Sequence, residues 1–487
     1  MSSRFSTHQP NVPGRGIVAS YGPTFWGLVM AIGVLAGLAG GALLELLRAV
    51  ERAAWGYSSG TFLDAVTASS NERRVIVLLC AGVIAGVGAL VLKRLRGFGG
   101  GEVSEAVWLQ DGRLSLLPSI SRGVLSMVIV GMGASIGREA GPQLAGGAFA
   151  SRLSDWARLP PWQRRLLVAC GAGAGMAAVY NVPLGGALFA VEVLLGTISL
   201  ALVLPALATS VVATATSWLV LGNETTYHVA TYGVSGSEIV WAIIVGPLAG
   251  LAAAIWVRMI TVAHDSRPSS ARARLLAPVV VFTVLGLLAI EYPQLLGNGK
   301  DTIELAITAQ LGVGLLAALV VLKPIVTAGC LGSGAPGGLF TPTLTFGVLF
   351  GGLLGYGWTQ LWPGTSYGAY AVIGGAAVLA ASMQGPLAAI VLTLELAHFT
   401  DTLIVPILLA VTAATVVARR LGLQSIYSAR LGSSPDPDDE SASPAELAAR
   451  LEMPEELAPD GRRTDIAAFG EQAPVTEPAK DPGAEGS

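Results

Sequence analysis

Uncharged apolar runs alternate with short polar segments along most of the chain. Five of these runs are 17 to 21 residues long: Thr24–Leu44, Val75–Leu92, Ile239–Val257, Leu305–Leu322 and Thr402–Ala418. A helix of about 20 apolar residues crosses the roughly 30 Å hydrocarbon core of a bilayer. The pattern therefore predicts an all-α polytopic membrane protein.

Two further apolar stretches are too long and too irregular to be simple spans. Val193–Asn223 has 31 residues without Asp, Glu, Lys or Arg, and Pro324–Leu394 has 71. Clusters of Gly and Pro interrupt both stretches. Because backbone that leaves a helix at membrane depth must be buried in protein or line a wet cavity, we expect tilted, broken and re-entrant helices here.

The composition agrees with a membrane protein. Of the 487 residues 53% are apolar and 13% are charged, against about 25% charged in soluble domains. This balance excludes an ordinary cytosolic enzyme and also nucleic acid as a partner. Cys80, Cys170 and Cys330 lie in apolar runs, so we expect free thiols. No group of residues has metal-ligand spacing, so neither a metal nor a cofactor is expected.

Charge divides the chain into a basic body and an acidic tail. From Ser434 onward there are 14 Asp and Glu against 4 Lys and Arg, whereas the preceding residues hold 25 basic and 18 acidic groups. We expect a short segment at 1–22, a membrane domain at 23–432 and a disordered tail at 433–487. Three basic clusters follow apolar runs and, by the positive-inside rule, face the cytoplasm: Lys93–Arg96, Arg267–Arg274 and Arg419–Arg420. Both termini are then cytoplasmic, in a multi-pass protein of the cell membrane.

Sequence landmarks recur in the same order at offsets of 200 to 203 residues. The matching pairs are Gly97-Phe98-Gly99 with Gly297-Asn298-Gly299, Arg122 with Lys323, Gly137 and Pro142 with Gly337 and Pro342, and Asn181-Val182-Pro183-Leu184 before Glu192 with Gln384-Gly385-Pro386-Leu387 before Glu395. Duplicated halves with matching Gly and Pro interruptions are typical of transporters with a binding site at the membrane midplane. We expect inverted halves at 23–222 and 238–432, with Glu192 and Glu395 making structural hydrogen bonds.

The glycine-rich segments 133–142 and 332–342 have the elements of an anion site. A helix N-terminus carries up to four unpaired N–H groups and about half a positive charge, so it binds an anion without a full cation. Glu139 lies in the first segment, and an ionisable residue within the membrane is functional by default. Its carboxylate can occupy such a site and leave when it is protonated or displaced. We therefore predict that Glu139 is a gate and that Gly137 and Arg138 contribute to anion binding.

These motifs resemble the CLC chloride channel and transporter family. The resemblance rests on Gly137-Arg138-Glu139, the Gly-Gly-Leu-Phe-Thr-Pro block at 337–342, Asn181-x-Pro-Leu and Ile426-Tyr427-Ser428-Ala429, in order between about residues 23 and 432. It implies a homodimer in the lipid bilayer, in which each subunit has its own pathway for chloride or a similar small anion.

The resemblance also implies roles for single residues. Glu139 matches the gating glutamate of the family. Leu339 and Phe340 match residues whose backbone amides contact the anion, and Tyr427 matches the tyrosine whose hydroxyl does so. Arg122 matches a basic residue near the anion pathway.

Three positions depart from the family pattern. Gly97-Phe98-Gly99-Gly100-Gly101 stands where Gly-Ser-Gly-Ile-Pro is common, so Phe98 and Gly99 are expected on the anion pathway without the serine hydroxyl. Val193 stands where proton-coupled members typically carry a glutamate as internal proton station. Glu139-Ala140-Gly141-Pro142 is one residue longer than the usual Glu-Gly-Pro.

The residues favour passive anion conduction gated by Glu139, because Val193 cannot carry a proton. The alternative is anion/proton exchange that uses the same glutamate. An intramembrane hydrolase built on Ser135 would need a base, and none of His8, His228, His264 and His398 is central in an apolar run. A membrane scaffold would not explain the matched Gly and Pro breaks. We therefore expect a transport protein and not an enzyme.

Overall fold

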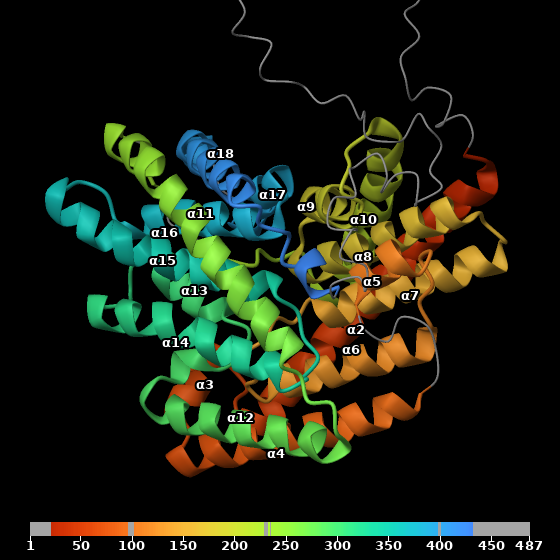
Figure 1. The fold of residues 1–487 in the computed structure, drawn as a ribbon, viewed down its shortest axis with the longest axis horizontal. Helices are drawn as coiled ribbons and strands as arrows, with labels where there is room; N and C mark the ends of the chain where they lie inside the picture. Colours follow the sequence, from red (N-terminus) through yellow and green to blue (C-terminus); the bar gives the residue numbers. More distant parts are fainter. Residues whose placement is uncertain (1–20, 96–101, 228–231, 234, 398–400, 432–487) are drawn as a thin grey trace, which may run out of the picture.

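The apolar runs fold into helices, because backbone polar groups inside a bilayer must be satisfied within the protein. The computed structural model describes residues 21–95, 102–227, 232–233, 235–397 and 401–431. Its elements in chain order are α2 Pro23–Trp55, α3 Phe62–Ala68, α4 Asn71–Arg94, α5 Val103–Leu109, α6 Leu116–Gly131, α7 Ala140–Trp156, α8 Pro161–Tyr180, α9 Pro183–Leu188, the π-helix η1 Phe189–Leu194, α10 Leu200–Leu221, α11 Gly236–Asp265, α12 Ala271–Glu291, η2 Pro293–Leu295, α13 Lys300–Ile307, α14 Val313–Gly332, α15 Phe340–Leu361, α16 Tyr367–Met383, α17 Pro386–Ala397, η3 Asp401–Leu403, α18 Ile404–Arg420 and η4 Ser428–Arg430 (Figure 1). Within these ranges the fold is all-α, as predicted.

In the part of the chain that the structure describes, six helices are long and apolar enough to cross a membrane: α2, α4, α10, α11, α12 and α14. The chain is therefore a multi-pass membrane protein. The apolar pattern missed α12 and was wrong for Leu305–Leu322, which is not one helix. That run breaks after Ile307, where Ala309 takes a positive φ of 59° and Gly312 precedes α14.

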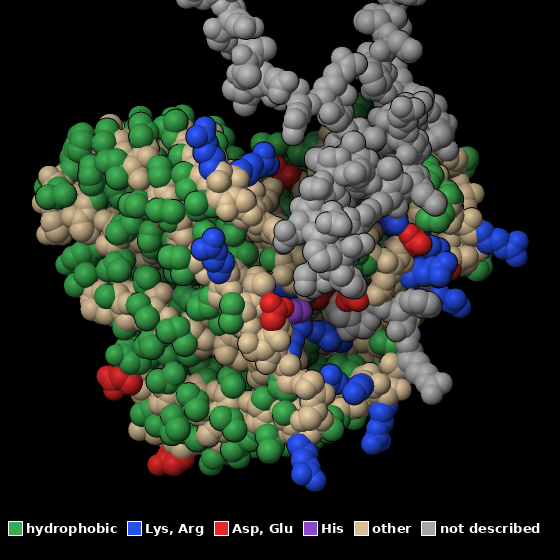
Figure 2. All heavy atoms as spheres, in the orientation of Figure 1, with side chains coloured by type: hydrophobic (Ala, Val, Ile, Leu, Met, Phe, Trp, Pro, Cys, Tyr) green, Lys and Arg blue, Asp and Glu red, His purple; other side chains and the backbone are tan. Residues whose placement is uncertain are grey.

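The surface fits a bilayer. Figure 2 shows hydrophobic side chains over most of the visible face where α11, α14 and α15 lie. Ile255 of α11, for example, is 68% exposed. Apolar side chains that water would penalise at this exposure are at no disadvantage against lipid tails. The hydrophobic outside is thus the expected outcome of the low charge content.

The two halves repeat one order of helices. In the first half α7 packs against α8, and in the second α15 packs against α16. Helices α8 and α16 end alike, at Asn181 with φ 57° and at Gln384 with φ 55°, and the following helices both begin with proline, Pro183 and Pro386. The equivalent helices α4 and α12 lie side by side at the lower edge of Figure 1.

Two glutamates tie the halves to each other. Glu192 accepts hydrogen bonds from the backbone N–H groups of Leu387 (3.1 Å) and Ala388 (2.5 Å), at the start of α17. Glu395 accepts from Leu184 (3.0 Å) and Gly185 (2.6 Å), at the start of α9. Each carboxylate thus satisfies the unpaired N–H groups of the other half's broken helix. Each half thus bonds to the other in the same way, as expected of a duplicated and inverted architecture.

Small residues let neighbouring helices approach closely. A Cβ added to Gly374 of α16 would lie 2.5 Å from the Cα atom of Gly351 on α15. Cβ atoms do not approach Cα atoms this closely, so glycine is needed at this crossing. Without a hydrophobic driving force between helices in lipid, such close packing supplies much of their association energy. The high glycine content is explained by these crossings as much as by the broken segments.

Candidate anion site

The two glycine-rich segments meet in the interior of the protein. Gly137 donates its N–H to the Gly338 carbonyl (2.8 Å), and Gly338 donates to the Gly137 carbonyl (2.9 Å). The segment between α6 and α7 therefore lies antiparallel to the segment between α14 and α15. These are the equivalent segments of the two halves, so the site forms where the two halves of the fold meet.

Glu139 carries the most heavily bonded carboxylate at this junction. It is 1% exposed. Its Oε1 accepts a hydrogen bond from the backbone N–H of Phe340 at 2.6 Å, and Phe340 is the first residue of α15. Its Oε2 lies 3.1 Å from the Tyr180 hydroxyl and 3.3 Å from the Thr341 hydroxyl. The carboxylate thus occupies the N-terminus of α15, a position whose N–H groups and dipole favour any anion.

Glycine leaves the space that this carboxylate fills. A Cβ on Gly338 would overlap the Glu139 carboxylate and lie 2.8 Å from its Cγ, and a Cβ on Gly137 would lie 2.6 Å from its Cδ. Any larger residue at either position would push the carboxylate away. The two glycines therefore form a backbone cradle of the size of one carboxylate or one small anion.

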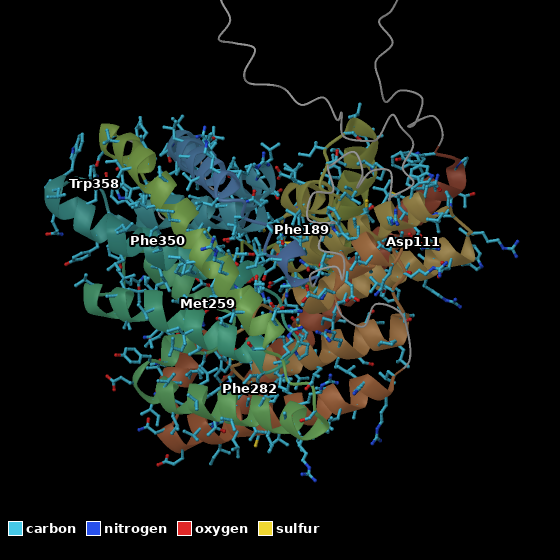
Figure 3. The ribbon with its side chains drawn as sticks, in the orientation of Figure 1. Asp111, Phe189, Met259, Phe282, Phe350 and Trp358 are labelled. Atoms are coloured by element: carbon cyan, nitrogen blue, oxygen red, sulfur yellow. The ribbon has the colours of Figure 1, made fainter. Side chains whose placement is uncertain are left out.

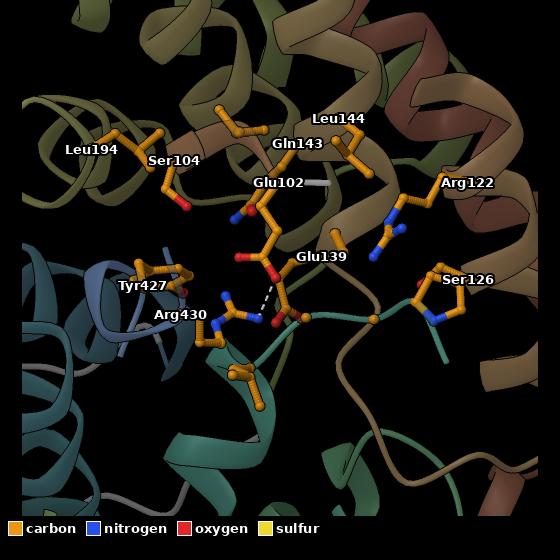
Figure 4. Close-up of a pocket in the computed structure, with 16 residues that line it drawn as sticks. Glu102, Ser104, Arg122, Ser126, Glu139, Gln143, Leu144, Leu194, Tyr427 and Arg430 are labelled. Atoms are coloured by element: carbon orange, nitrogen blue, oxygen red, sulfur yellow. Dashed lines mark hydrogen bonds and ion pairs between the residues drawn. The ribbon is translucent and has the colours of Figure 1, made fainter. Parts of the chain in front are cut away.

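A cavity of about 40 Å³ adjoins the carboxylate, and we call it the Glu139 cavity (Figure 4). A water molecule needs about 10–15 Å³ on this measure, so the cavity has room for a small ion and excludes organic substrates. Its wall includes Glu102, Arg122, Glu139, Gly337, Leu339, Tyr427 and Arg430. The predicted residues Glu139, Leu339, Tyr427 and Arg122 therefore lie around one space.

Two hydroxyl groups on this wall are buried without a partner. The Tyr427 and Ser126 hydroxyls have no hydrogen-bond partner among the residues that the structure describes. Tyr427 is 7% exposed. Its ring packs edge-on against that of Phe189, with ring centroids 5.5 Å apart, and Figure 3 labels Phe189. Because buried polar groups nearly always have a hydrogen-bond partner, these two hydroxyls indicate a site where a ligand accepts their hydrogen bonds.

Arg138 faces a different space. Its guanidinium lies over the Tyr180 ring, 4.9 Å from the centroid, and it lines a cavity of about 290 Å³ with Arg48, Arg52 and Lys300, which we call the Arg138 cavity. Tyr180 thus separates Arg138 from Glu139: it contacts the arginine with its ring and the carboxylate with its hydroxyl. Arg138 does not line the Glu139 cavity.

A third cavity, of about 330 Å³, opens beside Arg122. Its only charged wall residues among those described are Lys93, Arg122, Arg267 and Arg274, and we call it the basic vestibule. Burial lowers the pKa of Arg267 to about 10, so this arginine stays protonated at neutral pH. Four cations on one concave wall attract anions and raise their local concentration. Arg122 and Pro336 belong to the walls of both the vestibule and the Glu139 cavity.

The remaining predicted residues have simpler surroundings. Val193 is 7% exposed in η1, and a Cβ on Gly385 would lie 2.7 Å from its Cγ2, so the two residues are in close contact. Phe98 and Gly99 lie outside the described residues, as do 1–20 and 432–487. The Ser135 hydroxyl lies 3.2 Å from that of Thr327. Lys323, the counterpart of Arg122, is buried and donates hydrogen bonds to backbone carbonyls before α13.

Four residues of the site were not singled out from the sequence: Tyr180, Glu102, Arg430 and Ser126. Tyr180 directly precedes the Asn181-x-Pro-Leu motif, and Glu102 directly follows the glycine run at 99–101. Arg430 directly follows Ile426-Tyr427-Ser428-Ala429. These adjacencies are sequence signals for three of the four residues. Glu102, Ser126 and Arg430 reach the wall of the Glu139 cavity, and Tyr180 reaches the Glu139 carboxylate, only because helices meet in the folded chain.

Fold and site together define a class of protein: a multi-pass membrane protein whose inverted halves enclose an anion-sized site at the start of a broken helix. The family model described as voltage gated chloride channel matches residues 76–419. The chain belongs to this family.

Curated relatives are similar over most of the chain. A putative ClcB-like chloride channel protein of Ralstonia nicotianae is 34% identical over 422 residues, which is 84% of this chain and 96% of the relative. The voltage-gated ClC-type chloride channel ClcB of Salmonella typhimurium is 31% identical over 413 residues, or 81% of this chain and 96% of the relative.

Solved structures share the fold. A slow cyanobacterial Cl⁻/H⁺ antiporter matches with a TM-score of 0.74 at 22% identity, over 84% of this chain and 97% of that chain. A CLC-type fluoride/proton antiporter matches with a TM-score of 0.66 at 20% identity, over 83% and 96%. The arrangement of inverted, broken helices is therefore that of CLC proteins.

Proposed function

We propose that this protein transports chloride or a similar small anion across the membrane by passive conduction, with Glu139 as the gate. The observation that carries this proposal is the Glu139 carboxylate on the first N–H of α15, with the hydroxyls of Tyr180 and Thr341 beside it. A negatively charged oxygen already sits where a permeant anion would be bound. The names of the curated relatives support chloride as that anion.

The gate works by competition. While the carboxylate is charged and in place, it takes the donors that an anion needs. Protonation removes its charge, and a high anion concentration displaces it; in either case Phe340 N–H becomes free for the anion. Because the site uses N–H dipoles and not a full cation, an anion bound there can also leave.

The cavities suggest the route. An anion would collect in the basic vestibule, pass Arg122 into the Glu139 cavity, exchange with the carboxylate, and leave past Tyr180 and Arg138. The vestibule end carries basic charges alone among the described residues, and this attracts anions. The wall of the Arg138 cavity is mixed, with Arg48, Arg52, Arg138 and Lys300 beside Glu51, Asp301 and Glu304.

Passive conduction is favoured over exchange by Val193. Proton-coupled members of the family typically carry a glutamate at the position of Val193 as the internal proton station, and valine cannot carry a proton. Anion/proton exchange through Glu139 is the second candidate, and the two similar solved structures, both of antiporters, favour it.

The assembly and the sidedness are part of the proposal. We propose a homodimer in the cell membrane with one pathway in each subunit. The basic clusters support a vestibule and two termini on the cytoplasmic side, since Lys93, Arg267 and Arg274 line one cavity. We also propose a short N-terminal segment at 1–22, a membrane domain at 23–432 and an acidic tail at 433–487.

Chloride flux in proteoliposomes tests the gate. The substitution Glu139→Gln removes the charge and keeps the shape, so we expect flux that no longer changes between acidic and neutral pH. Glu395→Gln is the matched control, because Glu395 is also a carboxylate on helix N–H groups but lies outside the Glu139 cavity. If chloride flux through Glu139→Gln still changes with pH, the gate is contradicted.

A proton measurement separates the two candidates. An imposed chloride gradient drives uphill proton movement through an exchanger but not through a conductor. We expect chloride flux without stoichiometric proton movement. Sustained proton pumping in the unmodified protein would replace conduction by exchange.

A further inference from the structure

A second carboxylate lies on the wall of the Glu139 cavity, on Glu102 (Figure 4). We propose that Glu102 is a second gating carboxylate, which occupies an anion site formed by Arg430, Arg122 and the Tyr427 hydroxyl at the vestibule side of the cavity. The inference rests on the proposed transport of anions and adds a second point of control to it.

Arg430 is held in place for this role. Its Nη1 donates to Glu102 Oε1 at 2.6 Å, and its Nε donates to the carbonyl of Ile426 at 3.0 Å. The Arg430 side chain is 4% exposed and that of Glu102 is 21% exposed. The arginine is therefore fixed and buried, whereas the carboxylate is its more accessible partner.

The guanidinium also lies 5.7 Å over the Tyr427 ring. Arg430 follows Tyr427 by three residues, so the short helix η4 brings the guanidinium to the same wall as the unpartnered tyrosine hydroxyl. A donor without a partner and a cation with a removable partner thus border one anion-sized space. Such a pair of groups is what a small anion would need on this side of the cavity.

Charge on the cavity wall is balanced only while both carboxylates are present. The charged wall residues are Glu102, Glu139, Arg122 and Arg430. Beyond the wall, the Glu102 carboxylate also acts electrostatically on Arg267, His264 and Glu105. If the Glu102 carboxylate leaves Arg430, the vestibule side of the cavity gains one unit of positive charge.

Glu102 and Glu139 would act on the anion in the same way. Each carboxylate takes the donors of an anion site: Glu139 takes the N–H of Phe340, and Glu102 takes the guanidinium of Arg430. An anion that arrives from the basic vestibule meets Arg122 first, and then competes with Glu102 before it competes with Glu139. The pathway would therefore be closed by two carboxylates in series.

The competing explanation is a structural tie, in which the ion pair only fastens Glu102, the residue before α5, to η4. Glu102→Gln distinguishes the two, because it removes the charge and keeps the shape. We expect the chloride concentration for half-maximal flux to fall about tenfold, since the cavity gains a net positive charge at short range. The change is expected when chloride is varied on the vestibule side.

Glu105→Gln is the matched control. Glu105 lies in the same short helix and accepts a hydrogen bond from Gln110, but it does not line the cavity. Because its charge acts on the cavity only from behind the wall, we expect its half-saturation to change much less than tenfold. Glu102→Asp, which keeps the charge on a shorter side chain, is expected to lie between the unmodified protein and Glu102→Gln, and it carries the test if the glutamine variant does not fold.

An unchanged half-saturation in a folded Glu102→Gln protein, with or without a lower melting temperature, overturns the inference in favour of a structural tie. This result leaves the gate at Glu139 intact. Absence of chloride flux in the unmodified protein, or a Glu139→Gln variant that keeps its pH dependence, would instead overturn the proposed function.

Discussion

Tyr180 offers the most precise test of competition between the Glu139 carboxylate and the anion. Its hydroxyl lies 3.1 Å from Glu139 Oε2 and 2.5 Å from the Thr341 hydroxyl. Tyr180→Phe removes this oxygen alone. The ring would keep its edge-on contact with Phe340 at 5.5 Å and its place under the Arg138 guanidinium at 4.9 Å. The perturbation is therefore confined to one hydrogen-bond network.

The size of the effect follows from the geometry. A hydrogen bond to a charged group contributes about 1.5–3 kcal/mol. Thr341 is freed by the substitution and already lies 3.3 Å from the same carboxylate oxygen, so it replaces part of the loss. We therefore expect a loss just below this range, about 1.4 kcal/mol, which is a factor of ten in an equilibrium constant.

The anion loses less than the carboxylate does. The carboxylate has two oxygens: Oε1 is on the Phe340 N–H, and Oε2 is on the hydroxyls of Tyr180 and Thr341. A monatomic anion on the Phe340 N–H has no second atom to place on the hydroxyls. We therefore expect Tyr180→Phe to weaken the gate and to lower the half-saturating chloride concentration about tenfold.

Chloride-dependent initial flux in proteoliposomes measures this constant. Tyr370→Phe is the control, because Tyr370 is also a buried tyrosine, hydrogen-bonded to Ser237 at 2.9 Å, and does not line the Glu139 cavity. Its half-saturation should not change. A rise or no change in Tyr180→Phe would refute the reasoning, since it would mean that the hydroxyl binds the anion at least as strongly as it binds the carboxylate.

Two further substitutions test the glycine cradle and the buried lysine. In Gly338→Ala the new methyl group would overlap the Glu139 carboxylate and expel it, so chloride flux should become independent of pH. In the control Gly337→Ala the methyl group would meet Ile136 instead, so the flux should stay pH-dependent. Equal behaviour of the two variants would contradict the cradle. Lys323 donates to four consecutive backbone carbonyls before α13 at 2.9–3.4 Å and is 1% exposed, so Lys323→Met should lower the free energy of unfolding by about 2–3 kcal/mol in chemical denaturation. The exposed Lys93→Met should leave it unchanged, and an unchanged Lys323→Met would show that the carbonyls find other donors.

Much of the fold could be predicted because it depends on local composition. The run Thr24–Leu44 lies within α2, and Val75–Leu92 lies within α4, because about 20 apolar residues without charge have one stable state in a bilayer. The prediction was wrong for Leu305–Leu322. A polar turn around Gln310 is too short to lower mean hydropathy, yet a single positive φ at Ala309 is enough to end a helix.

The pairing of the halves was predictable in outline and not in register. The recurrence of Pro183 and Pro386, each nine residues before a glutamate, suggested equivalent segments. The structure adds that each glutamate bonds to the other half's helix and not to its own. Sequence order carries no information about which of two equivalent partners a carboxylate reaches.

The site divides in the same way. The sequence by itself determined that Glu139 lies at the start of a helix within a glycine-rich segment, because glycine, proline and an isolated charge have strong local preferences. Only the tertiary structure decided that the helix it serves is α15, and that Arg138 faces another cavity. It also decided that Tyr180 bonds to the Glu139 carboxylate, and that Glu102 and Arg430 line the cavity beside it. Contacts between residues some 200 to 330 positions apart depend on helix packing, and packing is decided by shape complementarity over whole helices, which no local pattern encodes.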